Sequence, residues 1–269
     1  MKLEFMKMSG AGNDFIMFNN MDSSLDSILS TDFIRTVCQR GLSAGADGLI
    51  EMKADTEYPF RMKYYNSDGS PAGMCGNGGR CVAVYAALQG IVTDSSAFSF
   101  RSDAGIHKAE ITGSDTARIW MTNPDIHFLN KPFELPSAKN ILISFLDTGV
   151  PQVVVFTDKD NFDGFNEQAP LLRRNEIFGA AGANVNYVSI LGDSRIMIRT
   201  WERGVEGETL ACGTGAVASA ICMNLLYNQK TPVQVQVKSG RILTVGKSGD
   251  GWWLEGEARP VYSAVLLNL

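Results

Sequence analysis

The sequence predicts an α+β protein of two pseudo-symmetric domains, each a curved, mostly antiparallel sheet wrapped around a central buried helix. Three observations favour this architecture: an internal repeat at half-length, short strands rich in Val, Ile and aromatic residues, and one strongly apolar helix in each half. The 269 residues are 45% hydrophobic and 20% charged, the balance of a folded globular protein. A chain of this size can bury a large core without disulfides or metal ions.

The internal repeat relates the two halves of the chain at one offset of 137 residues. Identities at a single ungapped offset across most of each half predict two similar structural units. The junction is expected between Asn123 and Pro136, where turn signals occur and apolar periodicity is weak. The predicted domains are therefore residues 1–123 and 124–257. The identical pairs are Gly12 and Gly149, Gly45-Ala46 and Gly182-Ala183, Cys75-Gly76 and Cys212-Gly213, Gly78 and Gly215, and Ala83 and Ala220.

The spacing of apolar residues predicts the individual elements. The segments after the two Cys-Gly pairs, residues 77–89 and 214–228, are apolar nearly all round, which indicates buried helices. Two amphipathic helices are expected near residues 31–40 and 169–178. Short runs rich in β-branched and aromatic residues predict strands. These strands are residues 59–65, 97–101, 117–121, 140–145, 152–156, 185–190, 195–201, 233–237, 241–246 and 252–256.

Charge and cysteine content limit the classes of function. The 24 Lys and Arg residues and 29 Asp and Glu residues give a net charge of −5, so no nucleic acid or anionic membrane is expected as a partner. A small-molecule partner is expected instead. The N-terminal segment has no long apolar core, and no apolar run reaches spanning length, so neither a signal peptide nor a membrane span is expected. The irregular spacing of five cysteines predicts a reduced, cytoplasmic protein.

Two segments, residues 66–81 and 202–216, end in Cys-Gly-x-Gly at the start of a predicted buried helix. Glycines let backbone amides turn toward a ligand, and a helix N-terminus combines free N–H groups with positive potential. The same potential stabilises a thiolate. Each half is therefore predicted to hold an activated thiol, Cys75 or Cys212, beside a cradle for a carboxylate or phosphate.

Two such thiols on opposite faces of one ligand would suit a racemase. One thiolate would remove the α-proton of an amino acid while the other thiol returns a proton to the opposite face. The two helix N-termini would stabilise the charge of the planar intermediate, so neither a cofactor nor a metal is required. A single cysteine before a buried helix is more often a packing residue, but two copies in register favour the functional hypothesis. The remaining thiols, Cys38, Cys81 and Cys222, are expected in the core.

Other chemistries find less support in the sequence. His107 and His127 lie outside every repeated motif, so the base is not expected to be a histidine. A zinc site is disfavoured because no C-x-x-C pair exists. The glycine-containing segment at residues 10–14 precedes a predicted strand at residues 15–18 instead of following one, which disfavours a phosphate loop.

Six motifs distinguish the sequence: KMSGAGNDF (7–15), GADGLI (45–50), NSDGSPAGMCGNGGRC (66–81), GVPQVVVF (149–156), GANVNYV (182–188) and ERGVEGETLACGTGA (202–216). In combination they resemble the diaminopimelate epimerase family, whose members interconvert LL- and meso-2,6-diaminopimelate without a cofactor. The resemblance runs nearly end to end, and it implies two similar domains with a cleft between them. It also implies that the last strand, within residues 258–269, returns to the first domain.

The resemblance implies roles for individual residues. Cys75 and Cys212 match the acid and base cysteines of the family. Glu202 and Arg203 match a pair suited to an ammonium and a carboxylate group, although a surface ion pair is the simpler interpretation of these two residues alone. Tyr262 matches a tyrosine of the family's dimer interface, so a homodimer is expected. The implied substrate-binding residues are Asn13, Asn66, Gly76, Asn77, Asn184, Glu202, Arg203, Gly213 and Thr214.

One segment departs from the family pattern, which commonly reads GNPH where this chain has Gly149-Val150-Pro151-Gln152. Val150 replaces an asparagine that contacts substrate, and Gln152 replaces a histidine near the thiols. A glutamine can hydrogen-bond a thiol, but it cannot exchange a proton near neutral pH. Gln152 and Glu202 are the residues expected to assist the thiols.

Three alternatives remain open at this point. The chain could be a racemase for another amino acid, or a non-catalytic amino-acid-binding relative that keeps the cleft. It could also be a thiol redox protein, which would require a reversible disulfide between Cys75 and Cys212. The implied setting of the epimerase is the synthesis of lysine and cell-wall precursors.

Overall fold

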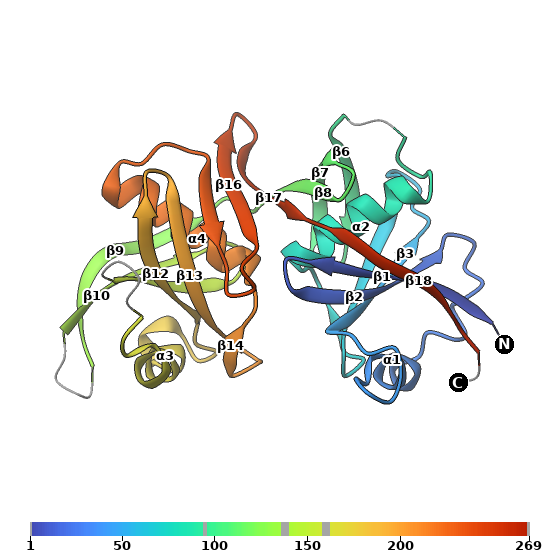
Figure 1. The fold of residues 1–269 in the computed structure, drawn as a ribbon, viewed down its shortest axis with the longest axis horizontal. Helices are drawn as coiled ribbons and strands as arrows, with labels where there is room; N and C mark the ends of the chain where they lie inside the picture. The colour runs from blue at the N-terminus through green and yellow to red at the C-terminus, as the bar shows by residue number, and fades with distance from the viewer. Residues whose placement is uncertain (1, 94–95, 136–139, 158–161, 268–269) are drawn as a thin grey trace. The chain divides into compact units, whose positions relative to one another are not determined.

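The structure is a computed structural model that describes residues 2–93, 96–135, 140–157 and 162–267. The chain forms two compact units (Figure 1). Unit 1 comprises Met1–Ile119 and Glu255–Leu269, and unit 2 comprises Trp120–Leu254. Both units combine helices with mixed sheets that are largely antiparallel, which confirms the predicted α+β class. No helix in the described part of the chain has the length and apolar character needed to span a membrane.

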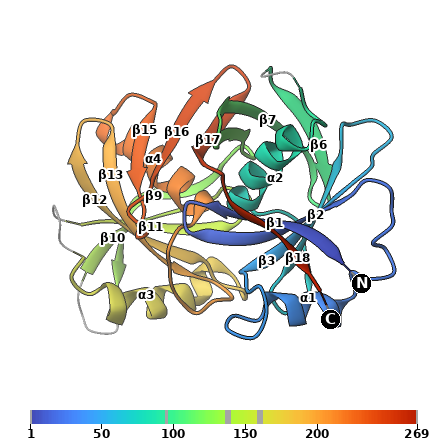
Figure 2. The same cartoon turned by 45° about the vertical axis from the view of Figure 1, so that its right-hand side comes forward.

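Unit 1 is a sheet that curves around the helix α2. Antiparallel pairs join β18 to β1, β1 to β2 and β3 to β4, whereas β2 and β3 are parallel. Helix α2 contacts β1, β2, β3, β4, β7 and β18, so the sheet surrounds it on several sides (Figures 1 and 2). The elements of this unit are β1 (Leu3–Gly10), β2 (Asn13–Asn20), α1 (Thr31–Cys38), β3 (Gly48–Lys53), β4 (Arg61–Asn66), β5 (Pro71–Ala72), α2 (Gly76–Leu88), β6 (Phe98–Ser102), β7 (Gly105–Gly113), β8 (Thr116–Trp120, which reaches the boundary) and β18 (Arg259–Leu266).

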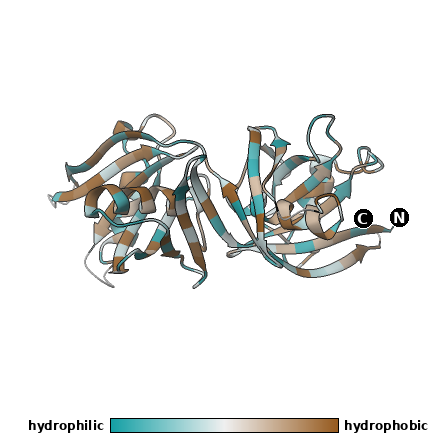
Figure 3. Ribbon diagram, turned by 90° about the horizontal axis from the view of Figure 1, so that it is seen from above, coloured by the Kyte–Doolittle hydropathy of each residue, from teal (hydrophilic) through white to brown (hydrophobic). Residues whose placement is uncertain are grey.

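Alternating side chains place two cores on the two faces of this sheet. Phe15 and Met17 of β2 pack in the cluster around α2, whereas Ile16 and Phe18 pack in a second cluster with Ile34 of α1. This alternation is the ordinary period of a strand that is buried on both faces. Figure 3 shows the resulting mixture of hydrophobic and hydrophilic positions along the strands.

Unit 2 repeats this plan around α4. Strands β10, β11, β12 and β13 are neighbours in that order, with β11 and β12 parallel. Helix α4 contacts β9 to β13, β15 and β16, while α3 packs on β12 and β13. The elements are β9 (Asp125–Glu134), β10 (Asn140–Asp147), β11 (Pro151–Thr157), α3 (Phe165–Arg173), η1 (Glu176–Phe178), β12 (Asn184–Gly192), β13 (Arg195–Glu202), β14 (Gly207–Thr209), α4 (Gly213–Tyr227), β15 (Val233–Gln236), β16 (Ile242–Ser248) and β17 (Gly251–Glu257, which crosses back to unit 1).

The four predicted helices are confirmed with shifted ends. The two buried helices begin one residue earlier than predicted, at Gly76 and Gly213. Helix α1 begins after Ser30, whose hydroxyl accepts a hydrogen bond from the Phe33 amide at 3.3 Å. The helix expected near residues 169–178 is instead α3 followed by the short turn η1, which begins a new segment after the capping Asn175.

The strand pairings correct the predicted repeat by one residue. In unit 1 Phe15 lies opposite Gly48, and in unit 2 Gln152 lies opposite Asn184, so the offset is 137 on the first strand and 136 on the second. The offset returns to 137 at the two buried helices, which begin at Gly76 and Gly213. The sequence comparison without a gap hid this shift.

Residues 125–134, in the stretch where turn signals predict the junction, form strand β9, which was not among the predicted strands. Its side chains are mostly exposed and it contains Pro132, so it has neither the apolar alternation nor the composition of a typical strand. Pairing with β10 stabilises this strand more than the strand propensity of its own residues does. Pro136 lies outside the described residues. Strands β1, β3, β5, β7 and β14 were also missing from the predicted elements, and β2 was predicted only over residues 15–18.

Candidate active site

The two repeated cysteines occupy equivalent positions at the N-termini of the buried helices. Cys75 is the N-cap of α2, with φ −134° and ψ 125°, and Cys212 is the N-cap of α4, with φ −124° and ψ 110°. Neither helix has an acidic residue in its first turn, so the positive end of each helix dipole is not offset there. Gly76 and Gly213 directly follow the cysteines, as predicted for amides that bind an anion.

The sulfur of Cys212 lies among two amide donors and one hydroxyl within unit 2. The Gly215 amide donates to Sγ at 3.4 Å, and the Asn184 side-chain amide donates at 3.8 Å. The Thr214 hydroxyl lies 3.5 Å from the same sulfur. Cys212 itself is only 5% exposed. Hydrogen bonds to a sulfur favour its charged form, so this arrangement supports a thiolate.

Gln152, which was expected to assist the thiol, is completely buried behind Thr214. Its Nε2 donates to the Thr214 hydroxyl at 2.9 Å, and its Oε1 accepts from Asn186 Nδ2 at 2.8 Å. Asn186 Oδ1 in turn accepts from the Thr200 hydroxyl at 2.8 Å. The polar groups therefore continue from the thiol across β11, β12 and β13.

Asn186 and Thr200 were not among the predicted site residues. Asn186 is the second asparagine of GANVNYV, two positions after Asn184, so both side chains leave the strand on the same face. That spacing is a signal the sequence contained, but Thr200 becomes relevant only through its pairing with Asn186.

In unit 1, the side chain of Asn77 links the helix start to β2. Its Nδ2 donates to Asn13 Oδ1, and Asn13 Nδ2 donates to Asp47 Oδ2 at 3.0 Å. The fully buried Arg80 donates to Asn77 Oδ1 at 2.9 Å and to the Gly76 carbonyl at 3.3 Å. Asn13 and Asn77 thus lie together, and Arg80 is a supporting residue that was not predicted.

A charged cluster holds the loop next to Asn13. Lys7 Nζ lies 2.9 Å from Asp14 Oδ2, and Arg40 donates to both Asp14 and Asp47. Burial alone would raise the pKa of Asp14, but the hydrogen bonds from Arg40 and Lys7 outweigh it and lower that pKa. The cluster therefore keeps a carboxylate at position 14 in the neutral pH range.

Asn66 and Glu202 occupy the ends of the equivalent strands β4 and β13. The Asn66 side chain is exposed and donates to Ser70 Oγ at 3.1 Å. Arg203 follows directly: its backbone amide donates to Asn184 Oδ1 at 2.8 Å and its guanidinium to the Gly182 carbonyl at 3.4 Å. The structure thus brings Asn184, Arg203 and Cys212 together in unit 2.

The three cysteines predicted in the core are buried. Burial raises the pKa of Cys38 to about 11, and those of Cys81 and Cys222 to about 12. These thiols therefore stay protonated near neutral pH. His107 is half-buried, its Nε2 lies 2.7 Å from Ser102 Oγ, and burial lowers its pKa.

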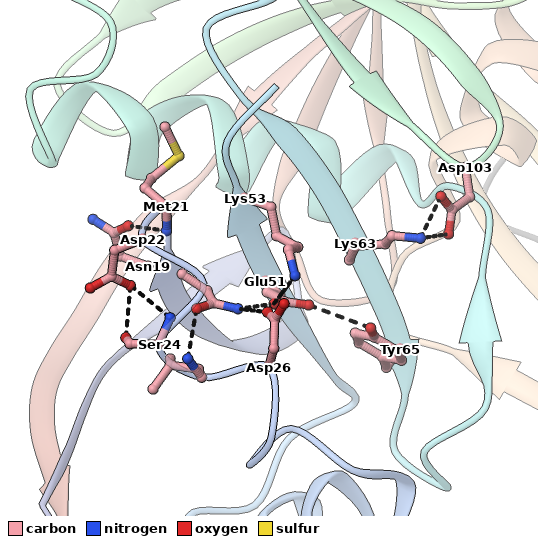
Figure 4. Close-up of polar contacts among 12 residues, drawn as sticks. Asn19, Met21, Asp22, Ser24, Asp26, Glu51, Lys53, Lys63, Tyr65 and Asp103 are labelled. Carbon is pink, nitrogen blue, oxygen red and sulfur yellow. Dashed lines mark hydrogen bonds and ion pairs between the residues drawn. The ribbon is translucent and has the colours of Figure 1, made fainter. Parts of the chain in front are cut away.

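Two other features of unit 1 contain none of the predicted substrate or thiol residues. Figure 4 shows the buried carboxylate of Glu51, which accepts from Tyr65 at 3.4 Å and lies 3.6 Å from Lys53 Nζ. Tyr262 on β18 is 45% exposed and packs edge-on against Phe5, with ring centroids 6.1 Å apart.

Comparisons with known proteins agree on one family. The family model described as diaminopimelate epimerase matches residues 5–127 and 144–259. The diaminopimelate epimerase of Chlorobaculum tepidum is 39% identical over 264 residues, covering 96% of this chain and 99% of that protein. The enzyme of the same name from Aquifex aeolicus is 38% identical over 261 residues, covering 92% and 91%.

Solved structures show the same fold at much lower identity. A phenazine biosynthesis protein of the PhzF family from Bacillus anthracis has a TM-score of 0.74 at 11% identity and covers 100% of both chains. A probable proline racemase from Agrobacterium radiobacter has a TM-score of 0.70 at 14% identity, covering 98% of this chain and 93% of that one. The family match over most of the sequence and the shared fold together show that this chain belongs to the diaminopimelate epimerase family.

Proposed function

We propose that the chain interconverts LL-2,6-diaminopimelate and meso-2,6-diaminopimelate, with Cys75 and Cys212 as the two acid/base groups. The observation that carries the proposal is the pair of cysteines at equivalent helix N-caps, one in each unit, in a chain of this family. The free amides of a helix N-terminus can hold a carboxylate beside such a thiol.

The proposed reaction exchanges one proton on each face of the α-carbon. A thiolate removes the α-proton and becomes a thiol, while the electron pair of the C–H bond moves into the α-carboxylate. The second thiol then donates its proton to the opposite face and becomes a thiolate. The amides of Gly76-Asn77 and Gly213-Thr214 stabilise the doubly charged carboxylate, which carries its largest charge in the intermediate. The step requires no redox change and no cofactor.

The remaining polar residues would recognise the substrate. Arg203 supplies a guanidinium for a carboxylate, and Glu202 supplies a carboxylate for an ammonium group. The amides of Asn13, Asn66 and Asn184 can donate and accept at either group. The proposal includes a cytoplasmic enzyme of lysine and cell-wall precursor synthesis that forms a homodimer through the surface around Tyr262.

Proton NMR of LL-diaminopimelate in deuterated water tests the activity with the reduced protein. The proposal expects loss of the α-proton signal together with the appearance of the meso form. A folded, reduced protein that causes neither change would contradict the proposal. Val150 and Gln152 favour a racemase of another amino acid as the second candidate, and a panel of amino acids in the same assay would identify it.

A further inference from the structure

Buried hydrogen bonds link Thr214, Gln152 and Asn186 behind Cys212, and one backbone carbonyl determines which group donates in each of them. Asn186 Nδ2 donates to the carbonyl oxygen of Val153 at 3.1 Å. A carbonyl oxygen can only accept, so the nitrogen of the Asn186 amide must face Val153. The Asn186 oxygen then faces Thr200, whose hydroxyl donates to it. The orientation of Asn186 is therefore determined by its partners and not by choice between two equivalent amide positions.

This orientation determines the next amide. The same Asn186 nitrogen points at Gln152, so Gln152 must present its Oε1 to Asn186 and its Nε2 to Thr214. Gln152 and Asn186 are both completely buried, so water does not offer them alternative partners. A reversed Gln152 would oppose two donors at 2.8 Å, which the low-dielectric interior makes costly.

The last link concerns the hydroxyl of Thr214. Gln152 Nε2 occupies one of the two acceptor positions of this oxygen and offers its proton no acceptor, while Cys212 Sγ lies 3.5 Å from the oxygen. The hydroxyl proton is therefore free to be donated to the sulfur. A donated hydrogen bond stabilises a thiolate, whereas an accepted one stabilises the thiol.

We propose that Gln152 and Asn186 are positioning residues which direct the Thr214 hydroxyl toward Cys212 and so hold Cys212 as a thiolate before substrate binds. Asn186 acts on the sulfur through Gln152 and Thr214, and we call these three side chains the relay. The Val153 carbonyl fixes the orientation of Asn186 and so the direction of the relay. Gln152 does not exchange protons itself. Its Nε2 donates to the Thr214 hydroxyl, so the charged form of Cys212 is stabilised without a neighbour that titrates. The role of this thiolate as a base depends on the function proposed above, but its presence does not.

The pH dependence of Cys212 alkylation by iodoacetamide measures the thiolate directly and requires no turnover. Rates are read by mass spectrometry at the Cys212 position, with fragmentation to separate it from Cys222. Thr214→Val removes the donor while keeping the shape, and we expect the midpoint pH to rise by about one unit. Gln152→Met and Asn186→Leu keep the Thr214 hydroxyl but remove the hydrogen bonds that orient it. We expect the midpoint pH to rise by about half a unit in each variant.

Two variants serve as matched controls. Thr214→Ser keeps the hydroxyl and should restore the original midpoint. Thr148→Val removes another hydroxyl bonded to the same residue, since Thr148 Oγ1 donates to the Thr214 carbonyl at 3.1 Å and not to its side chain. It should leave the midpoint unchanged, whatever it costs in stability. Circular dichroism confirms that each variant is folded.

An unchanged midpoint in folded Gln152→Met would overturn the proposal, even if Thr214→Val raises it. If Asn186→Leu does not fold, the comparison of Gln152→Met with Thr148→Val decides the matter. Proton exchange on LL-diaminopimelate by the unaltered enzyme is measured separately. Normal exchange with an unshifted midpoint rejects only the relay, whereas absent exchange with a shifted midpoint rejects only the proposed function.

Discussion

Behind the first turn of the buried helix, three matched strand positions carry aliphatic or aromatic side chains in unit 1 and polar ones in unit 2, although both units use the same strand pairings. In unit 1 Phe15, Ile50 and Tyr64 pack toward α2. The strand registers place Gln152, Asn186 and Thr200 at the equivalent positions in unit 2. The two units thus share a backbone arrangement but place different side chains behind their cysteines.

The first-turn glycines show that the positions correspond in space. A Cβ atom placed on Gly78 would lie 2.9 Å from Ile50 Cδ1, and one on Gly215 would lie 2.1 Å from Asn186 Oδ1. The equivalent side chains therefore lie directly against the equivalent glycine in both units and leave no room there for a Cβ atom.

A second difference concerns Asn184, which donates to Cys212. Its counterpart is Gly48, where an added Cβ would lie 2.7 Å from the Tyr64 ring. The Tyr64 ring of unit 1 therefore occupies the place where the Asn184 side chain of unit 2 donates to the cysteine sulfur. We infer that the repeat has kept the helix N-termini, which both units need to hold a carboxylate, while the surroundings of the two thiols have diverged.

The largest effect should come from the feature that the units share. Cys75→Ala and Cys212→Ala should each lower the epimerisation rate by about 10³-fold or more, because each removes the acid or base on one face. The rate of appearance of meso-diaminopimelate measures this loss. Retained epimerisation in either variant would show that the differing environments reflect one working thiol and one structural thiol.

The two first-turn glycines offer a sharper test of the comparison. Gly215→Ala should destabilise the protein by about 3 kcal/mol, because the buried amide of Asn186 is fixed by hydrogen bonds and cannot move aside. Gly78→Ala meets the flexible end of Ile50 and should cost about 1 kcal/mol. Urea unfolding measures both values, and equal losses would contradict the assigned contrast.

The smallest effect concerns acid stability and belongs to unit 1 alone. Asp14 has a lowered pKa, so its ion pairs stabilise the fold above its ordinary value of 3.8 and are lost as the pH falls through its lower folded value. Asp14→Asn should lower the stability by about 1 kcal/mol at pH 7. The difference from the unaltered protein should vanish at strongly acidic pH, as measured by urea unfolding across pH. A difference that persists there would mean that packing, not charge, is responsible.

The repeat made the two thiols, both buried helices and the fold class predictable from sequence. Identical Cys-Gly-x-Gly turns before apolar helices lead directly to the N-cap positions of Cys75 and Cys212. The polar relay was not predictable, because Gln152, Asn186 and Thr200 lie on three strands whose register depends on tertiary pairing. The one-residue shift between the halves further obscured which residue of unit 1 corresponds to Asn186. Strand β9 escaped prediction for a related reason, since its partner β10 stabilises it more than its own composition does.

The position of the isotope label at low conversion tests the two-thiol account most directly. LL-diaminopimelate is incubated with the enzyme in deuterated water, and the remaining substrate and the meso product are separated and analysed for deuterium. The account predicts deuterium in the product well in excess of that in the recovered substrate, because the group that donates is not the group that abstracted. Equal labelling of substrate and product would indicate a single exchanging base and would contradict the assignment of Cys75 and Cys212 to opposite faces.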